Sequence, residues 1–70
     1  MHLVNVSQTN NMYTLCVYNK NEDMFEESKH FSKMQRAKDF VDNEREIGSL
    51  KCACYIMTNN KILKRYSEIQ

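Results

Sequence analysis

The chain has 70 residues, of which 41% are hydrophobic and 27% are charged, and its formal net charge is +1. A chain of this length folds as one domain, residues 1–70, and buries only about 60% of its unfolded surface. The small net charge gives no overall field that favours nucleic acid, and no run of about 18 apolar residues is present to span a membrane. Three cysteines without the spacing of a disulfide framework predict a reducing, cytoplasmic environment.

Two predicted strands open the chain. Residues 2–9 mix β-branched with polar side chains, and the asparagine pair at 10–11 follows as a turn signal. Residues 12–19 alternate with period 2, which is typical of a half-buried strand. The alternation predicts one face with Tyr13, Leu15 and Val17 and a second face with Thr14, Cys16 and Tyr18.

A polar turn at 19–23 then leads to a third predicted strand at 24–31, which we expect to be half-exposed. Asn and Asp favour such a turn because their side chains cap it and tolerate left-handed backbone. The third strand is predicted to place Phe25, Glu27, Lys29 and Phe31 on one side.

Residues 31–49 predict one helix with a defined start and end. Ser32 and Gln35 have the spacing of a capping box, which satisfies two backbone N–H groups of the first turn. Gly48 is the only glycine, and it stands where a helix ends in a left-handed residue. The apolar stripe at helical spacing consists of Met34, Ala37, Phe40, Val41 and Ile47.

The charges of this helix oppose its dipole. Its first half carries the basic residues Lys33, Arg36 and Lys38, and its second half carries the acidic residues Asp39, Asp42, Glu44 and Glu46. Each misplaced charge near a helix end costs about 0.3–1 kcal/mol at low salt. Neutral drift explains this arrangement, and so does selection of the exposed helix face by a charged partner.

Beyond the helix, residues 51–57 are apolar on both faces and predict an internal strand. Residues 58–60 form a turn, and the more polar segment 61–66 is predicted to return as an edge strand. The predicted fold is therefore α+β: a single antiparallel or mixed sheet, in the order β-β-β-α-β-β, with one helix packed on one face.

One face of the predicted sheet has no second layer to cover it. The helix-facing side is expected to supply the core through Leu15, Val17, Ile56 and either Ile62 or Leu63. The uncovered side is expected to carry Tyr18, Tyr55 or Tyr66, Met57 and one or two cysteines. A contiguous exposed apolar surface of this kind usually marks an interaction site.

Catalytic, metal and cofactor sites find little support in the residue pattern. Cys52 and Cys54 could be joined by Cys16 and a histidine, but this spacing matches no standard zinc site, and packing of free thiols is the favoured interpretation. The acidic residues of 22–27 cluster on a solvated hairpin, and no Gly-rich phosphate loop is present. We expect a protein that is not an enzyme and holds no metal or cofactor.

Nucleic-acid binding is a separate interpretation, which depends on a basic and aromatic tract in the last strand. The tract consists of Lys61, Lys64, Arg65 and Tyr66. Proteins that bind single strands combine such basic groups with aromatic platforms on a sheet. Lysines on an edge strand also have a purely structural explanation, because they prevent unwanted strand pairing.

The size, composition and element order resemble those of the small single-domain proteins that bacteriophages and mobile elements use against host defences, anti-CRISPR proteins among them. The stretch KNEDMF, Lys20 to Phe25, is similar to part of a phage-encoded antitoxin that neutralises a host ribonuclease toxin. The resemblance implies a non-catalytic inhibitor that binds a host protein or ribonucleoprotein complex in the bacterial cytoplasm.

The predicted contact surface combines the acidic hairpin, the exposed helix face and the last strand. Its residues are Glu22, Asp23, Glu26, Arg36, Asp39, Asp42, Lys64, Arg65 and Tyr66. A homodimer through the bare sheet face or an edge strand is compatible with protein binding and with nucleic-acid binding.

Overall fold

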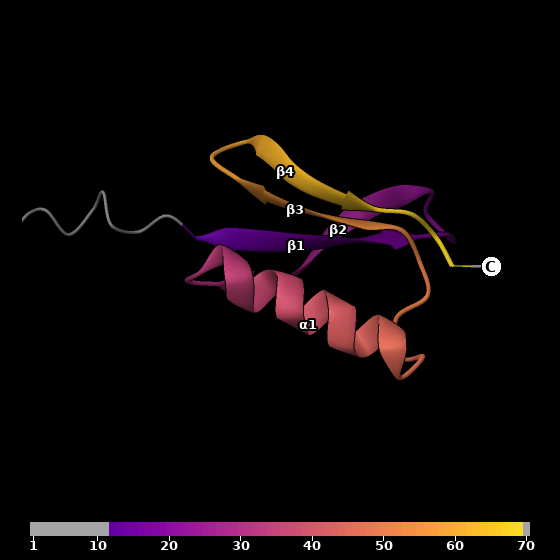
Figure 1. The fold of residues 1–70 in the computed structure, drawn as a ribbon. Helices are drawn as coiled ribbons and strands as arrows, with labels where there is room; N and C mark the ends of the chain where they lie inside the picture. The colour runs from indigo at the N-terminus through magenta and orange to yellow at the C-terminus, as the bar shows by residue number, and fades with distance from the viewer. Residues whose placement is uncertain (1–11, 70) are drawn as a thin grey trace, which may run out of the picture.

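The computed structural model describes residues 12–69, which form one antiparallel sheet and one helix. The elements are β1 (Tyr13–Asn19), β2 (Met24–Phe31), α1 (Met34–Glu46), β3 (Cys54–Thr58) and β4 (Lys61–Tyr66). The helix lies along one face of the sheet (Figure 1). The predicted α+β class is confirmed, with the order β-β-α-β-β across this range. The strand predicted at 2–9 lies outside the described residues.

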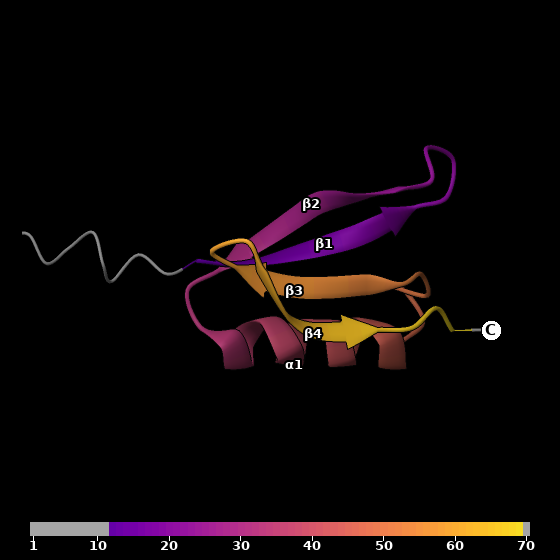
Figure 2. The same ribbon diagram turned by 90° about the horizontal axis from the view of Figure 1, so that it is seen from above.

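The sheet order is β2-β1-β3-β4, so β1 and β3 are internal and β2 and β4 are the edges (Figure 2). Every neighbouring pair is antiparallel. Helix α1 connects β2 to β3, which lie on either side of β1. The internal position of β3 and the edge position of β4 confirm the predictions, although β3 begins only at Cys54, later than residue 51.

The core lies between the helix and the two central strands. Five residues in this layer have relative exposures of 0–1%: Leu15, Ala37, Val41, Cys54 and Ile56. Partly buried side chains surround them, including Val17 from β1 and Phe31 from β2. The period-2 assignment of the faces of β1 is therefore confirmed, because Leu15 and Val17 both pack toward the helix.

Neither of the two residues offered as alternatives for the core on β4 is buried, and the last residue of the helix stripe is exposed as well. Ile62 and Leu63 on β4 keep 41% and 45% of their surface accessible, because β4 is an edge strand and a bulge shifts its register beside Ile56 and Met57. Ile47 is 65% exposed because α1 ends at the preceding residue.

The start of α1 differs from the predicted capping box. The N-cap residue is Lys33, whose extended backbone (φ −134°, ψ 140°) is typical of an N-cap, but no side chain caps the helix. Ser32 therefore lies one residue too early. The Gln35 side chain donates to Asp39 Oδ1 at 2.9 Å, four residues along the helix. The capping-box prediction is wrong, and the first turn contains no acidic residue.

The end of α1 matches the prediction. Gly48 has φ +85°, in the left-handed region that side chains disfavour. This conformation turns the chain so that the backbone N–H groups of Ser49 and Leu50 donate to the Glu44 carbonyl at 2.9 and 3.2 Å. Gly48 thus closes the helix as a left-handed C-terminal cap does.

A bulge in β2 overturns the prediction that its alternate residues share one side. Leu15 pairs with Lys29 while the next residue, Cys16, pairs with Glu27, so Ser28 is the extra residue. Lys29 and Phe31, after the bulge, face the helix, because the Lys29 Nζ lies 5.4 Å from the Phe40 ring centroid and the Phe31 ring centroid lies 5.5 Å from it. Phe25 and Glu27, before the bulge, lie on the opposite face.

Candidate functional site

We use the term outer face for the side of the sheet opposite α1. Strand pairing arranges its side chains in three rows that run across the strands. The middle row, from β2 to β4, is Glu27, Cys16, Tyr55 and Arg65; it is flanked on one side by His30, Thr14, Met57 and Ile62, and on the other by Phe25 and Tyr18. Within residues 12–69, no helix lies over this face (Figure 1).

Three aromatic rings form a continuous cluster on the outer face. The centroid of the Phe25 ring lies 5.4 Å from that of Tyr18 and 4.5 Å from that of Tyr55, in tilted geometries that aromatic pairs favour. Phe25 remains 38% exposed. The cluster therefore joins three strands with a surface that is apolar and open to solvent.

Sulfur atoms fill the centre of this surface. The Cys16 thiol contacts Met57 Sδ at 3.7 Å, and Cys16 is only 4% exposed although it lies on the outer face. Burial raises the pKa of the Cys16 thiol, and burial likewise raises the pKa of the Tyr55 hydroxyl. A raised thiol pKa means less thiolate at neutral pH, which makes the buried Cys16 thiol a weaker nucleophile.

Opposite charges stand at the two ends of the middle row. Glu27 is exposed on β2, where its nearest basic group within residues 12–69 is His30, with an Nε2–Oε1 distance of 3.9 Å. Arg65 is exposed on β4, and no carboxylate of the described residues lies within 4.0 Å of its guanidinium. The outer face is thus an apolar centre with an acidic end and a basic end.

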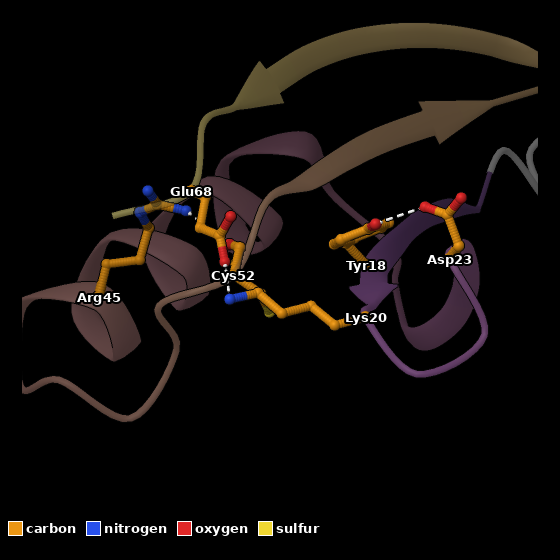
Figure 3. Close-up of polar contacts among 6 residues, drawn as sticks. All are labelled: Tyr18, Lys20, Asp23, Arg45, Cys52 and Glu68. Atoms are coloured by element: carbon orange, nitrogen blue, oxygen red, sulfur yellow. Dashed lines mark hydrogen bonds and ion pairs between the residues drawn. The ribbon is translucent and has the colours of Figure 1, made fainter. Parts of the chain in front are cut away.

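The acidic hairpin lies at one end of the sheet, beyond the outer face. Asn19 shapes its turn by accepting from the backbone N–H groups of Asn21 and Glu22 at 2.9 and 3.2 Å. The Tyr18 hydroxyl donates to Asp23 Oδ1 at 2.5 Å, as Figure 3 shows. The Asn19 side chain also donates to Glu26 at 3.0 Å. Hydrogen bonds within the hairpin therefore hold the side chains of Asp23 and Glu26 and the backbone of Glu22.

The basic and aromatic tract of β4 is divided between the two faces. Tyr66 pairs with the buried Cys54 on the helix side, where Lys64 Nζ lies 5.4 Å from its ring centroid and the Arg45 guanidinium 5.6 Å from it. Arg65, between them, lies on the outer face. Lys64, Arg65 and Tyr66 therefore do not form one surface, contrary to the interpretation of the tract as a unit.

The predicted helix residues belong to the helix side of the molecule. Arg36, Asp39 and Asp42 are all exposed. Burial raises the pKa of the Tyr66 hydroxyl, and the carboxylates of Asp42 and Asp39 raise it further, so these two aspartates lie near β4. The nine predicted contact residues are thus separated into the hairpin, the helix side and, for Arg65 alone, the outer face.

Polar contacts tie the hairpin end of the molecule to its C-terminal segment. Lys20 Nζ pairs with Glu68 Oε2 at 2.5 Å, and Arg45, near the end of α1, donates to the Cys52 carbonyl at 3.2 Å (Figure 3). Arg45 also donates to the Ser67 carbonyl. Sequence reasoning missed these contacts, because Lys20–Glu68 and Arg45–Ser67 join residues far apart in the chain and no local pattern indicates them.

Sequence reasoning also missed the contribution of Glu27 to the outer face. The alternation along 24–31 correctly assigned Phe25 and Glu27 to one side of the sheet. It wrongly assigned Lys29 and Phe31 to the same side. Only the position of the bulge separates the two pairs, and bulges have no fixed residue signature outside glycine.

Residues 12–69 contain neither the side-chain grouping of a metal site nor a helix that could cross a membrane. No group of three or more His, Cys, Asp or Glu side chains among residues 12–69 is arranged to hold a metal ion. Helix α1, at 13 residues, is too short and too polar to cross a membrane, and no other helix occurs in this range. A surface hollow is lined by four consecutive residues of β4, Ile62 to Arg65.

Comparisons with protein-family models, curated proteins and solved structures found no match to this chain. The outer face is therefore interpreted from its own geometry.

Proposed function

We propose that this chain is a non-enzymatic protein that acts by binding another protein through the outer face. The observation that carries the proposal is the exposure of large apolar side chains opposite a complete core: Phe25 is 38% and Ile62 is 41% exposed. Both lie on the same face as the half-buried Tyr18, Tyr55 and Met57. Contiguous apolar surface of this kind marks interaction sites.

Covering the outer face would stabilise a complex by removing this surface from water. Each partly exposed side chain such as Phe25 or Ile62 contributes about 1–2 kcal/mol when a partner covers it, at about 25 cal/mol per Å² of apolar area. Aromatic and Met side chains are also the residue types that protein interfaces favour. A few such residues at the centre of a patch supply most of the binding energy.

The two sheet edges are poorly suited to receive an added strand. Both edge strands are bulged, β2 at Ser28 and β4 at Leu63, and a bulge twists an edge away from further pairing. Charged side chains on both edges add to this effect. The proposed partner therefore docks face to face, with an apolar centre, a basic group that meets Glu27 and an acidic group that meets Arg65.

Nucleic-acid binding is the alternative, through the tract of Lys61, Lys64, Arg65 and Tyr66. Protein binding is favoured over it because Arg65 lies on the opposite face of the sheet from Lys64 and Tyr66. That alternative predicts an affinity that falls linearly with salt on a log–log scale in gel-shift titrations. The inhibition of a host-defence protein in the bacterial cytoplasm, implied by the resemblance to phage accessory proteins, stays a prediction about the partner's identity.

The test compares one substitution on the outer face with one elsewhere. Phe25→Ser removes an exposed ring of the aromatic cluster, and Ile47→Ser removes a side chain that is 65% exposed at the end of α1. The binding protein is captured from bacterial lysate, purified, and titrated against each variant by calorimetry. We expect Phe25→Ser to weaken binding about tenfold or more and Ile47→Ser to leave it unchanged. Equal binding by both variants would contradict the proposal.

A further inference from the structure

We infer that the outer face binds a second copy of this chain, in a symmetric dimer whose two-fold axis runs parallel to the strands. This inference rests on the proposed function, because it names the protein that occupies the outer face. Its basis is the order of the middle row, which reads acid, thiol, phenol and base from one sheet edge to the other.

A two-fold axis along the strands makes this row complementary to itself. Such an axis reverses the order of the strands, so that β2 of one copy lies over β4 of the other, and it leaves positions along the strands unchanged. Glu27 of each copy then faces Arg65 of the other, and Cys16 faces Tyr55. The two opposite-charge pairs form at the two rims of the interface, where charge sets orientation and register.

A two-fold axis that crosses the strands along the middle row, by contrast, fails on charge. It places β2 of one copy over β2 of the other, so that the middle row lies on itself unreversed. Glu27 would then face Glu27, and Arg65 would face Arg65. Juxtaposed like charges are destabilising, so the charges of the row select the axis along the strands. In that arrangement the two sheets pack with their strand directions within about 30° of each other.

Glu27 and Arg65 lie where the proposed dimer needs them, each beside its neighbour in the middle row and without a strong ionic partner among the described residues. Glu27 is close enough to Cys16, and Arg65 close enough to Tyr55, for each charge to perturb the pKa of its neighbour in the row. Neither charged group has a close ionic partner within residues 12–69, beyond the His30 contact at 3.9 Å. Both side chains are therefore available to the second copy.

The size of the face sets the strength of the dimer. Four strands about 4.8 Å apart, with about five residues of about 3.3 Å each, project onto roughly 300 Å² per copy. Side-chain relief brings the surface buried by both copies to roughly 1,000 Å², which is at the lower limit for specific protein interfaces. We therefore expect a weak dimer, with a dissociation constant in the micromolar range or above.

The experiment is a charge exchange measured by sedimentation equilibrium on the full chain. Glu27→Lys alone and Arg65→Glu alone each create like-charge pairs and should weaken dimerisation about tenfold or more, while the double variant restores opposite charges and should return to within about threefold of the original. The matched controls are Glu46→Lys and Lys33→Glu, which make the same charge changes on exposed residues at the two ends of α1. Both controls should leave the dimer unchanged.

The possible outcomes separate this inference from the proposed function. A monomer at about 1 mM, a dimer insensitive to the two single variants, or a double variant no better than the singles would each overturn the dimer described here. If the chain is monomeric but Phe25→Ser still removes binding of a different protein, the outer face remains the binding surface and only its occupant changes. If a dimer forms and survives Phe25→Ser, the dimer uses another surface and this inference fails, while the proposed function is still decided by the titration of the captured protein against Phe25→Ser.

Discussion

The unsupported start of α1 gives a quantitative prediction: replacing Lys33 by Asp should stabilise the protein. Lys33 already has the extended backbone of an N-cap residue, and no side chain caps the helix. An Asp carboxylate there can accept from a backbone N–H of the first turn, which contributes about 0.5–2 kcal/mol. Reversing the charge beside the positive end of the helix dipole adds about 0.3–1 kcal/mol at low salt.

Two further substitutions at this position separate the cap from the charge. Lys33→Ala removes the positive charge without adding a cap, and Lys33→Asn adds a cap without a negative charge. We expect the melting temperature to rise in the order Ala, Asn, Asp, by about 4–8 °C for each kcal/mol in a domain of this size. Thermal unfolding followed by circular dichroism, at low and high salt, measures the series. Among these three variants, only the difference in melting temperature between Asp and Asn should decrease with salt, because it alone depends on a charge.

A variant Lys33→Asp no more stable than Lys33→Ala would refute the reasoning, since it would show that neither a cap nor the dipole limits this helix. The binding properties provide a second check. Lys33 lies at the start of α1, on the opposite side of the sheet from the outer face, so the substitution should change stability and leave dimerisation unaltered. If Lys33→Asp instead weakened dimerisation, the charged residues of α1 would belong to the dimer interface.

Gly48→Ala should lower stability by about 1 kcal/mol or more in urea unfolding, because a side chain at φ +85° is strained; an unchanged midpoint would mean that the backbone relaxes there. The cysteines should differ in reactivity toward iodoacetamide at neutral pH. Cys16 and Cys54 are buried, and burial raises the pKa of both thiols, so less thiolate is present and alkylation should be at least about tenfold slower than at the half-buried Cys52. Mass spectrometry of the partly alkylated chain measures the three rates, and equal rates would contradict the assigned burial.

The parts of the fold that follow from local patterns could be predicted from the sequence. The alternation along β1 identified which of its residues face the core, and Leu15 is fully buried as this prediction requires. The single glycine marked the end of α1 because its left-handed backbone is a local property. The apolar character of β3 on both faces predicted that it is internal.

The predictions from the sequence were wrong where the pairing between strands overrides a local pattern of residues. The bulge at Ser28 divides β2 between two faces, and the bulge at Leu63 turns Ile62 to the outer face beside Met57. Neither bulge contains a glycine or a proline that would reveal it. The row from Glu27 to Arg65 depends on both shifts in register. The sequence therefore predicted a bare sheet face but not which charges stand at its edges.

The most direct test of the dimer through the outer face is a dilution series followed by methyl NMR on the full chain. Methyl signals of Met57 and Ile62 on the outer face should shift between about 10 µM and about 1 mM as the weak dimer forms, while those of Ala37 and Val41 in the core should not. Shifts confined to the helix side, or methyl signals of Met57 and Ile62 that stay constant over the whole range, would contradict the account.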